Sequence, residues 1–122
     1  KLSYMRTCYG HIAGKIGVKF TESLIENNYI KEEENFYKLT QEGKTWLKKI
    51  GIETEKSMYF KPIPKHIDWT ERKNHMAGPI ALKITEKMIE LSWIEKSEIN
   101  RCLNLTKKGK SAFKTYLNMN IP

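Results

Sequence analysis

The sequence predicts an α+β fold in which two helix–β-hairpin–helix repeats pack pseudo-symmetrically through their long helices. Three observations predict it: a segment that occurs twice, an apolar stripe of helical period in each copy, and two short β-prone runs after each stripe. We expect a single domain over 1–122, with repeats at about 6–52 and 68–118. A proline-containing connector over 53–67 is expected to join them.

The duplication can be read directly from the residues. Residues 11–30 read HIAGKIGVKFTESLIENNYI, residues 75–94 read HMAGPIALKITEKMIELSWI, and ten of the twenty aligned pairs are identical. After a two-residue insertion, LTQEGK at 39–44 matches LTKKGK at 105–110. The insertion falls where a turn is expected, and turns tolerate changes in length. Both copies are therefore expected to have the same local structure.

The first copy begins with a predicted amphipathic helix. Apolar side chains recur every four residues at Ile12, Ile16, Phe20 and Leu24, so one face of this helix is apolar. Gly14 follows an alanine, and this small pair suits a close approach between helices. The remaining predicted elements are β-prone runs at 29–30 and 36–39 and a closing helix over 41–50, with Thr40 as its N-cap.

The second copy repeats this pattern. Its stripe consists of Met76, Ile80, Ile84 and Met88, and Gly78 again follows an alanine. The remaining predicted elements are β-prone runs at 93–94 and 102–105 and a closing helix over 107–117, with Thr106 as its N-cap.

Two features distinguish the start of the second copy. Asp68 and Glu71 have the spacing of a capping box, which predicts that the second long helix begins there. Pro79 has no counterpart in the first copy, where Lys15 stands. Since proline has no amide hydrogen to donate, we expect a kink or a restart of the helix near Gly78.

Composition narrows the class of protein. The net charge of +8 and the pI near 9.5 are typical of proteins that bind nucleic acids. A basic surface that is only solvated gives the same net charge. No apolar run is long enough to span a membrane, and two cysteines without a secretory signal indicate a reducing cytoplasm. We find no nucleophile signature or glycine-rich phosphate loop, so we expect no enzyme.

Three segments resemble one family of bacterial regulators. The pattern Tyr37-x-Leu39-Thr40-x-x-Gly43-x-x-x-Leu47 resembles the wing and closing helix of winged-helix proteins. Residues 6–18, RTCYGHIAGKIGV, resemble the RTCYDHLAGxLGV segment of ArsR-type transcriptional regulators, and 66–78 resemble their CLDWTERRxHLAG segment. Gly10 and His66 depart from the Asp and Cys of those patterns, which puts any ligand role carried over from them in doubt.

The resemblance implies the C-terminal regulatory or assembly domain of a repressor. In that family these segments follow an ArsR winged helix, which binds DNA and which we expect upstream of Lys1. The resemblance also implies a homodimer in the full-length protein. A small effector could bind in an apolar cavity between the two long helices.

The residues separately argue against DNA reading by this chain. A helix-turn-helix needs a short helix and a tight turn before its recognition helix, whereas the first copy has only ten residues before its long helix and the second has the proline-containing connector there. The expected hairpin tips also carry acidic residues, such as Glu32 and Glu98, that phosphates repel. The alternative is a stand-alone nucleic-acid-binding module. Its candidate contacts are the lysines of the closing helices: Lys44, Lys48, Lys107 and Lys108.

A metal- or thiol-sensing site is the other alternative. Cys8 and His11 are one turn apart if their stretch is helical, and His66 and His75 complete the candidate set. A soft thiolate with imidazoles suits zinc or a similar ion. The same histidines are also explained as buried hydrogen-bonding groups that hold the two halves together. We expect a structural role for Gly14, Gly78, Asp68 and Glu71.

Overall fold

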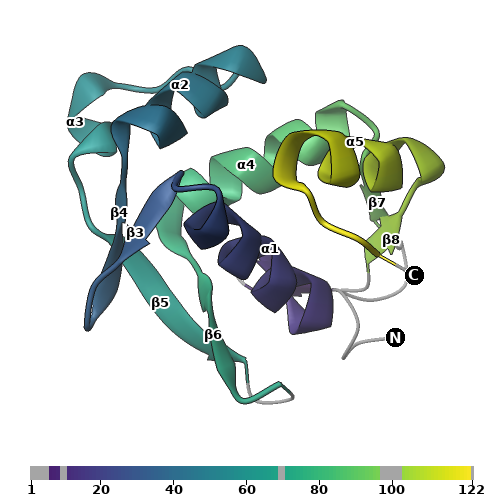
Figure 1. The fold of residues 1–122 in the computed structure, drawn as a ribbon, viewed down its shortest axis with the longest axis horizontal. Coiled ribbons are helices and arrows are strands. Elements are labelled where there is room, and N and C mark those ends of the chain that lie inside the picture. Colours follow the sequence, from purple (N-terminus) through teal and green to yellow (C-terminus); the bar gives the residue numbers. More distant parts are fainter. Residues whose placement is uncertain (1–5, 9–10, 69–70, 97–102, 122) are drawn as a thin grey trace.

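The computed structural model describes residues 6–8, 11–68, 71–96 and 103–121, with side chains from residue 14 onward. Figure 1 shows an α+β arrangement in which helices α1 and α4 occupy the centre, as the sequence predicts. The elements in chain order are β1 (Arg6–Cys8), β2 (His11–Ala13), α1 (Gly14–Glu26), β3 (Ile30–Glu32), β4 (Phe36–Leu39), α2 (Gln41–Lys49), α3 (Lys56–Tyr59), β5 (Ile63–Asp68), β6 (Lys73–Met76), α4 (Gly78–Glu90), β7 (Ile94–Lys96), β8 (Leu103–Leu105) and α5 (Lys107–Leu117).

All strand pairs in the described residues are antiparallel, and they form three sheets. The largest has the order β3-β4-β5-β6, and it is joined at its centre where Tyr37 of β4 pairs with Ile63 of β5. The strand pairs β1–β2 and β7–β8 form two separate hairpins. None of the helices in the described ranges is long and apolar enough to cross a membrane.

The same order of elements, hairpin–helix–hairpin–helix, occurs twice, and α3 lies between the two occurrences. We call β1 through α2 the first unit and β5 through α5 the second unit. The long helices α1 and α4 both have thirteen residues. The predicted helix–hairpin–helix order is therefore present in both units, and each unit has an additional hairpin ahead of its long helix.

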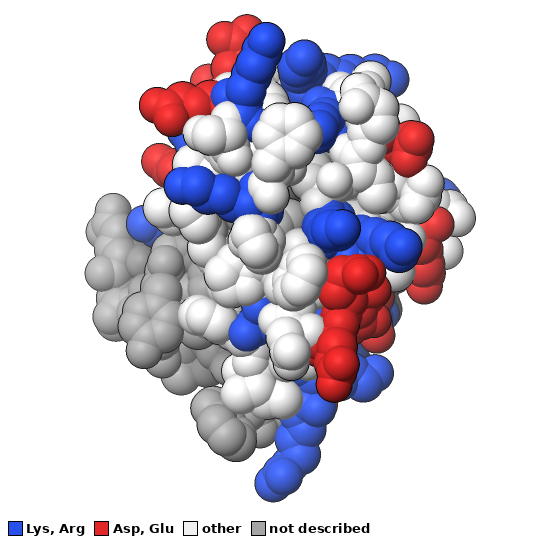
Figure 2. Space-filling model, turned by 90° about the vertical axis from the view of Figure 1, so that its left-hand side faces the viewer, with Lys and Arg blue, Asp and Glu red and all other residues white. Residues whose placement is uncertain are grey.

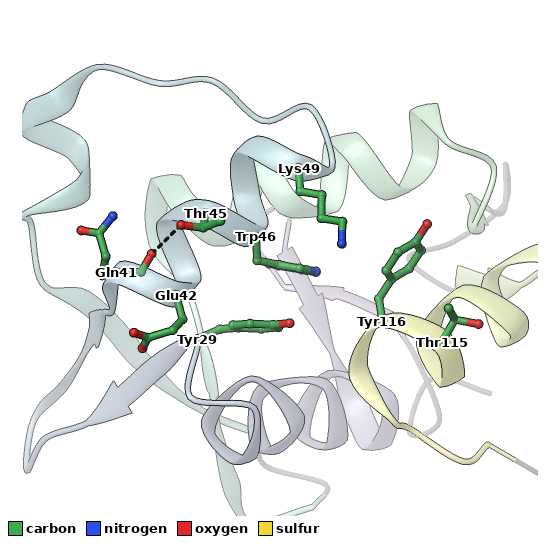
Figure 3. Close-up of a pocket in the computed structure, with 8 residues that line it drawn as sticks. All are labelled: Tyr29, Gln41, Glu42, Thr45, Trp46, Lys49, Thr115 and Tyr116. Carbon is green, nitrogen blue, oxygen red and sulfur yellow. Dashed lines mark hydrogen bonds between the residues drawn. The ribbon is translucent and has the colours of Figure 1, made fainter.

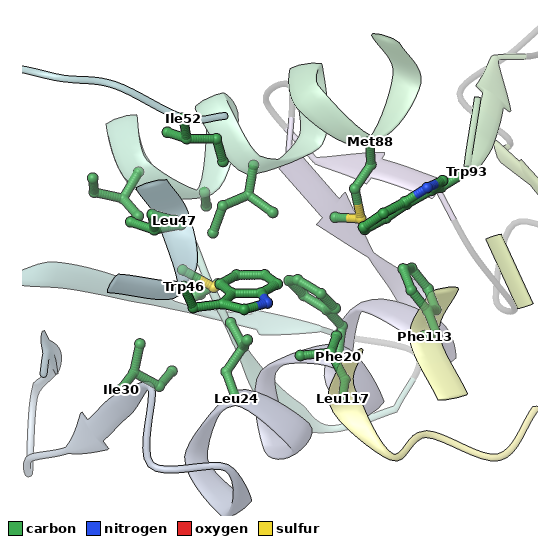
Figure 4. Close-up of a cluster of buried hydrophobic side chains, with 14 of the residues drawn as sticks. Phe20, Leu24, Ile30, Trp46, Leu47, Ile52, Met88, Trp93, Phe113 and Leu117 are labelled. Carbon is green, nitrogen blue, oxygen red and sulfur yellow. The ribbon is translucent and has the colours of Figure 1, made fainter. Parts of the chain in front are cut away.

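Each long helix packs against the first hairpin of the other unit. Helix α1 lies along β6, and α4 packs against β2. A buried hydrogen bond fixes the first of these contacts, since the hydroxyl of Thr21 accepts from the amide of Met76 at 3.0 Å. The apolar stripes of both helices then share one core, shown in Figure 4, with members such as Phe20, Leu24 and Met88.

Both long helices start later than the apolar stripe predicts. Residues 11–13 and Met76 extend the stripe on paper, yet they lie in strands β2 and β6. The helices begin at Gly14 and Gly78, whose φ values are +76° and +81°. Such left-handed backbone costs glycine little, so each glycine turns the chain from a strand into a helix. A Cβ at Gly78 would also lie 2.8 Å from Pro64 Cδ.

The predicted capping box at Asp68 and Glu71 is wrong, because Asp68 ends strand β5 and α4 starts ten residues later. The Asp68 carboxylate instead accepts from the Glu71 amide at 3.0 Å within the β5–β6 turn. Its second oxygen accepts from the Gly14 amide at 2.6 Å. Asp68 therefore places a carboxylate at the N-terminus of the first long helix, where the helix dipole favours negative charge.

The predicted extended connector is also wrong in part, because residues 53–67 contain helix α3 and most of β5. Ile63 and Pro64 pair with β4, so β5 forms part of the largest sheet. Of the two outcomes expected for Pro79, the structure shows a helix start at Gly78. Proline in the first helical turn costs no hydrogen bond, since amides there have no partner within the helix.

Candidate functional site

Both closing helices are positioned by the same junction. In the first unit the Thr40 hydroxyl donates to Asn28 O at 2.6 Å and accepts from the Gly43 amide at 2.9 Å, which confirms the predicted N-cap. A Cβ at Gly43 would lie 2.0 Å from Tyr29 O, so only glycine allows α2 to approach the preceding turn this closely. This requirement explains the Thr-x-x-Gly pattern.

The second unit repeats these contacts. The Thr106 hydroxyl donates to Ser92 O at 2.6 Å and accepts from the Gly109 amide at 2.9 Å, which confirms the second N-cap. A Cβ at Gly109 would lie 2.0 Å from Trp93 O. The end of α5 is tied to α1, because the Ser23 hydroxyl donates to Leu117 O at 2.7 Å. Helices α2 and α5 are thus fixed relative to the core.

A cleft of about 480 Å³ lies between these two closing helices (Figure 3). Its size falls in the range of sites that bind small molecules. It does not lie between the long helices α1 and α4. The lining residues are Tyr29, Gln41, Glu42, Thr45, Trp46, Lys49, Thr115 and Tyr116.

Stacked aromatic pairs border the cleft on both sides. Tyr29 and Trp46 stack with ring centroids 5.1 Å apart, and Trp93 and Tyr116 stack with centroids 5.7 Å apart. Trp46 is 5% exposed, and its indole Nε1 has no hydrogen-bond partner within the described residues. Burying such a donor unpaired costs about 1–3 kcal/mol. Figure 3 shows Nε1 directed from α2 toward Tyr116.

The acidic and the basic side chain of the cleft lie at different places. Glu42 lies at one end and accepts from the Asn28 side-chain amide at 2.7 Å. Lys49 lies near the gap between Trp46 and Tyr116, and no carboxylate of the described residues pairs with its ammonium. The end of the cleft beside Lys49 therefore has an exposed ammonium, and the indole N–H close to it is covered in this structure.

The predicted metal or effector residues fall into two cross-strand pairs. His66 and His75 are register partners on β5 and β6, with ring centroids 6.2 Å apart. Cys8 and His11 are register partners on β1 and β2, so the assumption that their stretch is helical is wrong. Their side chains lie outside the described residues. Within the side chains that are described, no group of three potential ligands could hold a metal.

The candidate nucleic-acid lysines differ in exposure. Lys44 is half-buried, and its ammonium lies 4.3 Å from the centroid of the Phe60 ring, which is a cation–π contact. Lys48, Lys107 and Lys108 are exposed. Figure 2 shows the face that contains the β3–β4 hairpin, where lysines and carboxylates of the described residues are interspersed rather than gathered by sign.

The sequence patterns do not predict the residues that build the cleft. Trp46 and Lys49 lie on α2 together with Gln41 and Thr45, which also line the cleft. An alignment of the two copies contains a signal, because Trp46 aligns with Ala112 and Tyr116 aligns with Ile50. These are large aromatic residues that only one copy has.

Comparison with known proteins gives one similarity over nearly the whole chain. The chain is 34% identical over 122 residues to an uncharacterized HTH-type transcriptional regulator, YdfF, of Bacillus subtilis (strain 168). The alignment covers 98% of this chain and 54% of that protein, so the chain spans about half the length of this relative. No protein-family description and no solved structure matches the chain.

Proposed function

We propose that this chain is the C-terminal regulatory or assembly domain of an ArsR-like transcriptional repressor. In this proposal its two repeats form a pseudo-symmetric domain that couples effector binding or homodimerisation to a DNA-binding winged helix upstream of Lys1. The chain itself performs no catalysis and acts in the cytoplasm. The observation that carries the proposal is an alignment to a regulator named as HTH-type. The alignment covers 98% of this chain and 54% of that regulator.

Two structural features support a regulatory rather than a DNA-reading role. In a helix-turn-helix, a short helix and a tight turn come before the recognition helix. Ahead of the long helix, each unit here has a two-stranded hairpin, β1–β2 or β5–β6, instead of a helix–turn–helix. The cleft between α2 and α5 has the size of an effector site.

DNA binding by two forms of the protein tests this proposal. We expect the gene product that includes the region upstream of Lys1 to bind duplex DNA of its own promoter. The 122-residue chain alone should show no binding at low salt, measured by fluorescence anisotropy. Tight, salt-dependent binding by the chain alone would instead favour the stand-alone nucleic-acid module, with Lys48, Lys107 and Lys108 as candidate contacts.

A metal or thiol sensor is the second candidate, and the cross-strand pairing of Cys8 with His11 and of His66 with His75 favours it. It predicts stoichiometric zinc uptake that Cys8→Ser and His11→Ala abolish and that Cys102→Ser, at the second cysteine, leaves unchanged. Metal analysis of purified protein and a zinc titration of the melting temperature measure both. A metal-free protein whose melting temperature ignores zinc would exclude the sensor.

A further inference from the structure

The cleft between α2 and α5 combines three properties that together point to a ligand. It lies between two stacked aromatic pairs, Tyr29–Trp46 from the first unit and Trp93–Tyr116 from the second. The Trp46 indole N–H is buried, has no partner in the described residues, and is directed toward the cleft. Beside it, Lys49 offers an ammonium without a carboxylate partner among the described residues.

We propose that this cleft binds a small planar aromatic molecule that carries a carboxylate. This inference rests on the proposed function, in which the ligand is the effector. The aromatic rings of Trp46 and Tyr116 would contact the ring of the ligand. Its carboxylate would accept a charge-assisted hydrogen bond from Lys49. It would accept a second one from the Trp46 indole when the side chains that cover this buried N–H move aside, so that the unpaired donor becomes satisfied.

The position of the cleft explains how binding there could be transmitted. Lys49 and Trp46 belong to α2, and Tyr116 belongs to α5, so a bound molecule contacts the closing helices of both units. A ligand shifts a conformational equilibrium only by the difference in its affinity for the two states. One that bridges α2 and α5 favours those conformations in which the two helices keep a fixed spacing.

Calorimetric titration of the 122-residue chain with indole-3-carboxylate tests the ligand class. We expect saturable one-to-one binding, and at least about tenfold weaker binding of the neutral indole-3-methanol and of the non-aromatic cyclohexanecarboxylate. Lys49→Gln should weaken binding by about tenfold. Lys48→Gln, on the same helix and outside the cleft, should change it by less than about twofold.

The indole contact has its own variant. Trp46→Phe keeps an aromatic ring and removes the N–H, and it should weaken binding by about fivefold if the variant keeps its fold. Lys49 is exposed, so its substitution leaves the core intact and decides the question even if Trp46→Phe unfolds the protein. Absence of binding up to about 10 mM, or equal losses in Lys49→Gln and Lys48→Gln, would overturn the proposal.

Failure of the ligand class and failure of the proposed function give different results. If the full-length gene product binds its promoter but indole-3-carboxylate does not bind the cleft, the ligand class is overturned and the regulatory function stands. If the probe binds and depends on Lys49, but the full-length product binds no DNA, the ligand class stands and the regulatory function is overturned.

Discussion

The junctions that carry the two closing helices can be compared contact by contact. In both units a threonine hydroxyl donates at 2.6 Å to a carbonyl of the preceding turn and accepts at 2.9 Å from a glycine amide. Asn28 and Ser92, which supply those carbonyls, have φ values of +61° and +62°. The junction is therefore one structural device used twice.

The helix faces above these junctions differ. Trp46 of α2 aligns with Ala112 of α5, and Tyr116 of α5 aligns with Ile50 after α2. Each closing helix thus contributes one large aromatic ring to the cleft, at a different place along the helix. The junctions that the two copies share therefore position the closing helices, whereas the helix faces in which the copies differ supply the side chains that a ligand would contact.

Alanine at either junction glycine should have the largest effect and should break both units equally. A Cβ at Gly43 or Gly109 would lie 2.0 Å from a backbone carbonyl oxygen, so the closing helix must move away. We expect Gly43→Ala and Gly109→Ala each to lower the free energy of unfolding by about 3 kcal/mol, measured by urea denaturation.

Substitution of an exposed residue on a closing helix is the control for that measurement. Ser111→Ala on α5 should change stability by less than about 0.5 kcal/mol, because its side chain is exposed. A loss of about 3 kcal/mol in one glycine variant and of less than about 1 kcal/mol in the other would show that the two junctions are not equivalent.

Removal of the Asp68 carboxylate should have the next largest effect, and it affects a contact described in one unit only. Asp68 is 1% exposed and accepts from the amides of Gly14 and Glu71. We expect Asp68→Ala to lower the free energy of unfolding by about 2 kcal/mol, because both amides lose their acceptor.

The neighbouring acidic residue provides the control. Glu71 contributes its backbone amide to this contact, so Glu71→Ala should change stability by less than about 0.5 kcal/mol. Equal losses in Asp68→Ala and Glu71→Ala would show that the net charge of the β5–β6 turn, and not the hydrogen bonds of Asp68, carries the effect.

Local elements of the fold could be predicted from the sequence because their causes are local. The N-caps Thr40 and Thr106, the β3–β4 and β7–β8 hairpins and helices α2 and α5 all follow from patterns within a few residues. The apolar stripes correctly predicted a core shared by both long helices. The caps, hairpins and closing helices depend on neighbours in the chain, and each apolar stripe lies within one helix.

Features that depend on distant residues could not be predicted. The apolar stripes predict helix at Ile12 and Met76, whereas these residues lie in strands β2 and β6, which pack against the long helix of the other unit. Asp68 was assigned to the nearer helix because nothing local indicates that it reaches Gly14. The sequence does not predict the cleft, because its walls, Trp46 and Tyr116, belong to two helices that are far apart in the chain.

The smallest effect is expected for removal of the two cap hydroxyls. This removal tests whether the two junctions contribute equally to the free energy of unfolding, as their equal geometry predicts. Thr40→Ala and Thr106→Ala should each lower the free energy of unfolding by about 1 kcal/mol, the usual worth of an N-cap. Thr40→Ser and Thr106→Ser keep the oxygen and should recover most of that loss. Thr45→Ala provides the control, since the Thr45 hydroxyl is exposed and donates only within α2.

The serine variants distinguish the effect of losing the hydroxyl from the effect of losing the methyl group. Alanine removes both the hydroxyl, which bonds to Gly43 or Gly109, and the methyl group of threonine. If serine is as damaging as alanine, the methyl contact stabilises the junction and the hydrogen bonds contribute little. If serine rescues Thr40→Ala but not Thr106→Ala, the caps differ in strength despite equal distances, and divergence between the units then extends from the helix faces into the junctions that carry them.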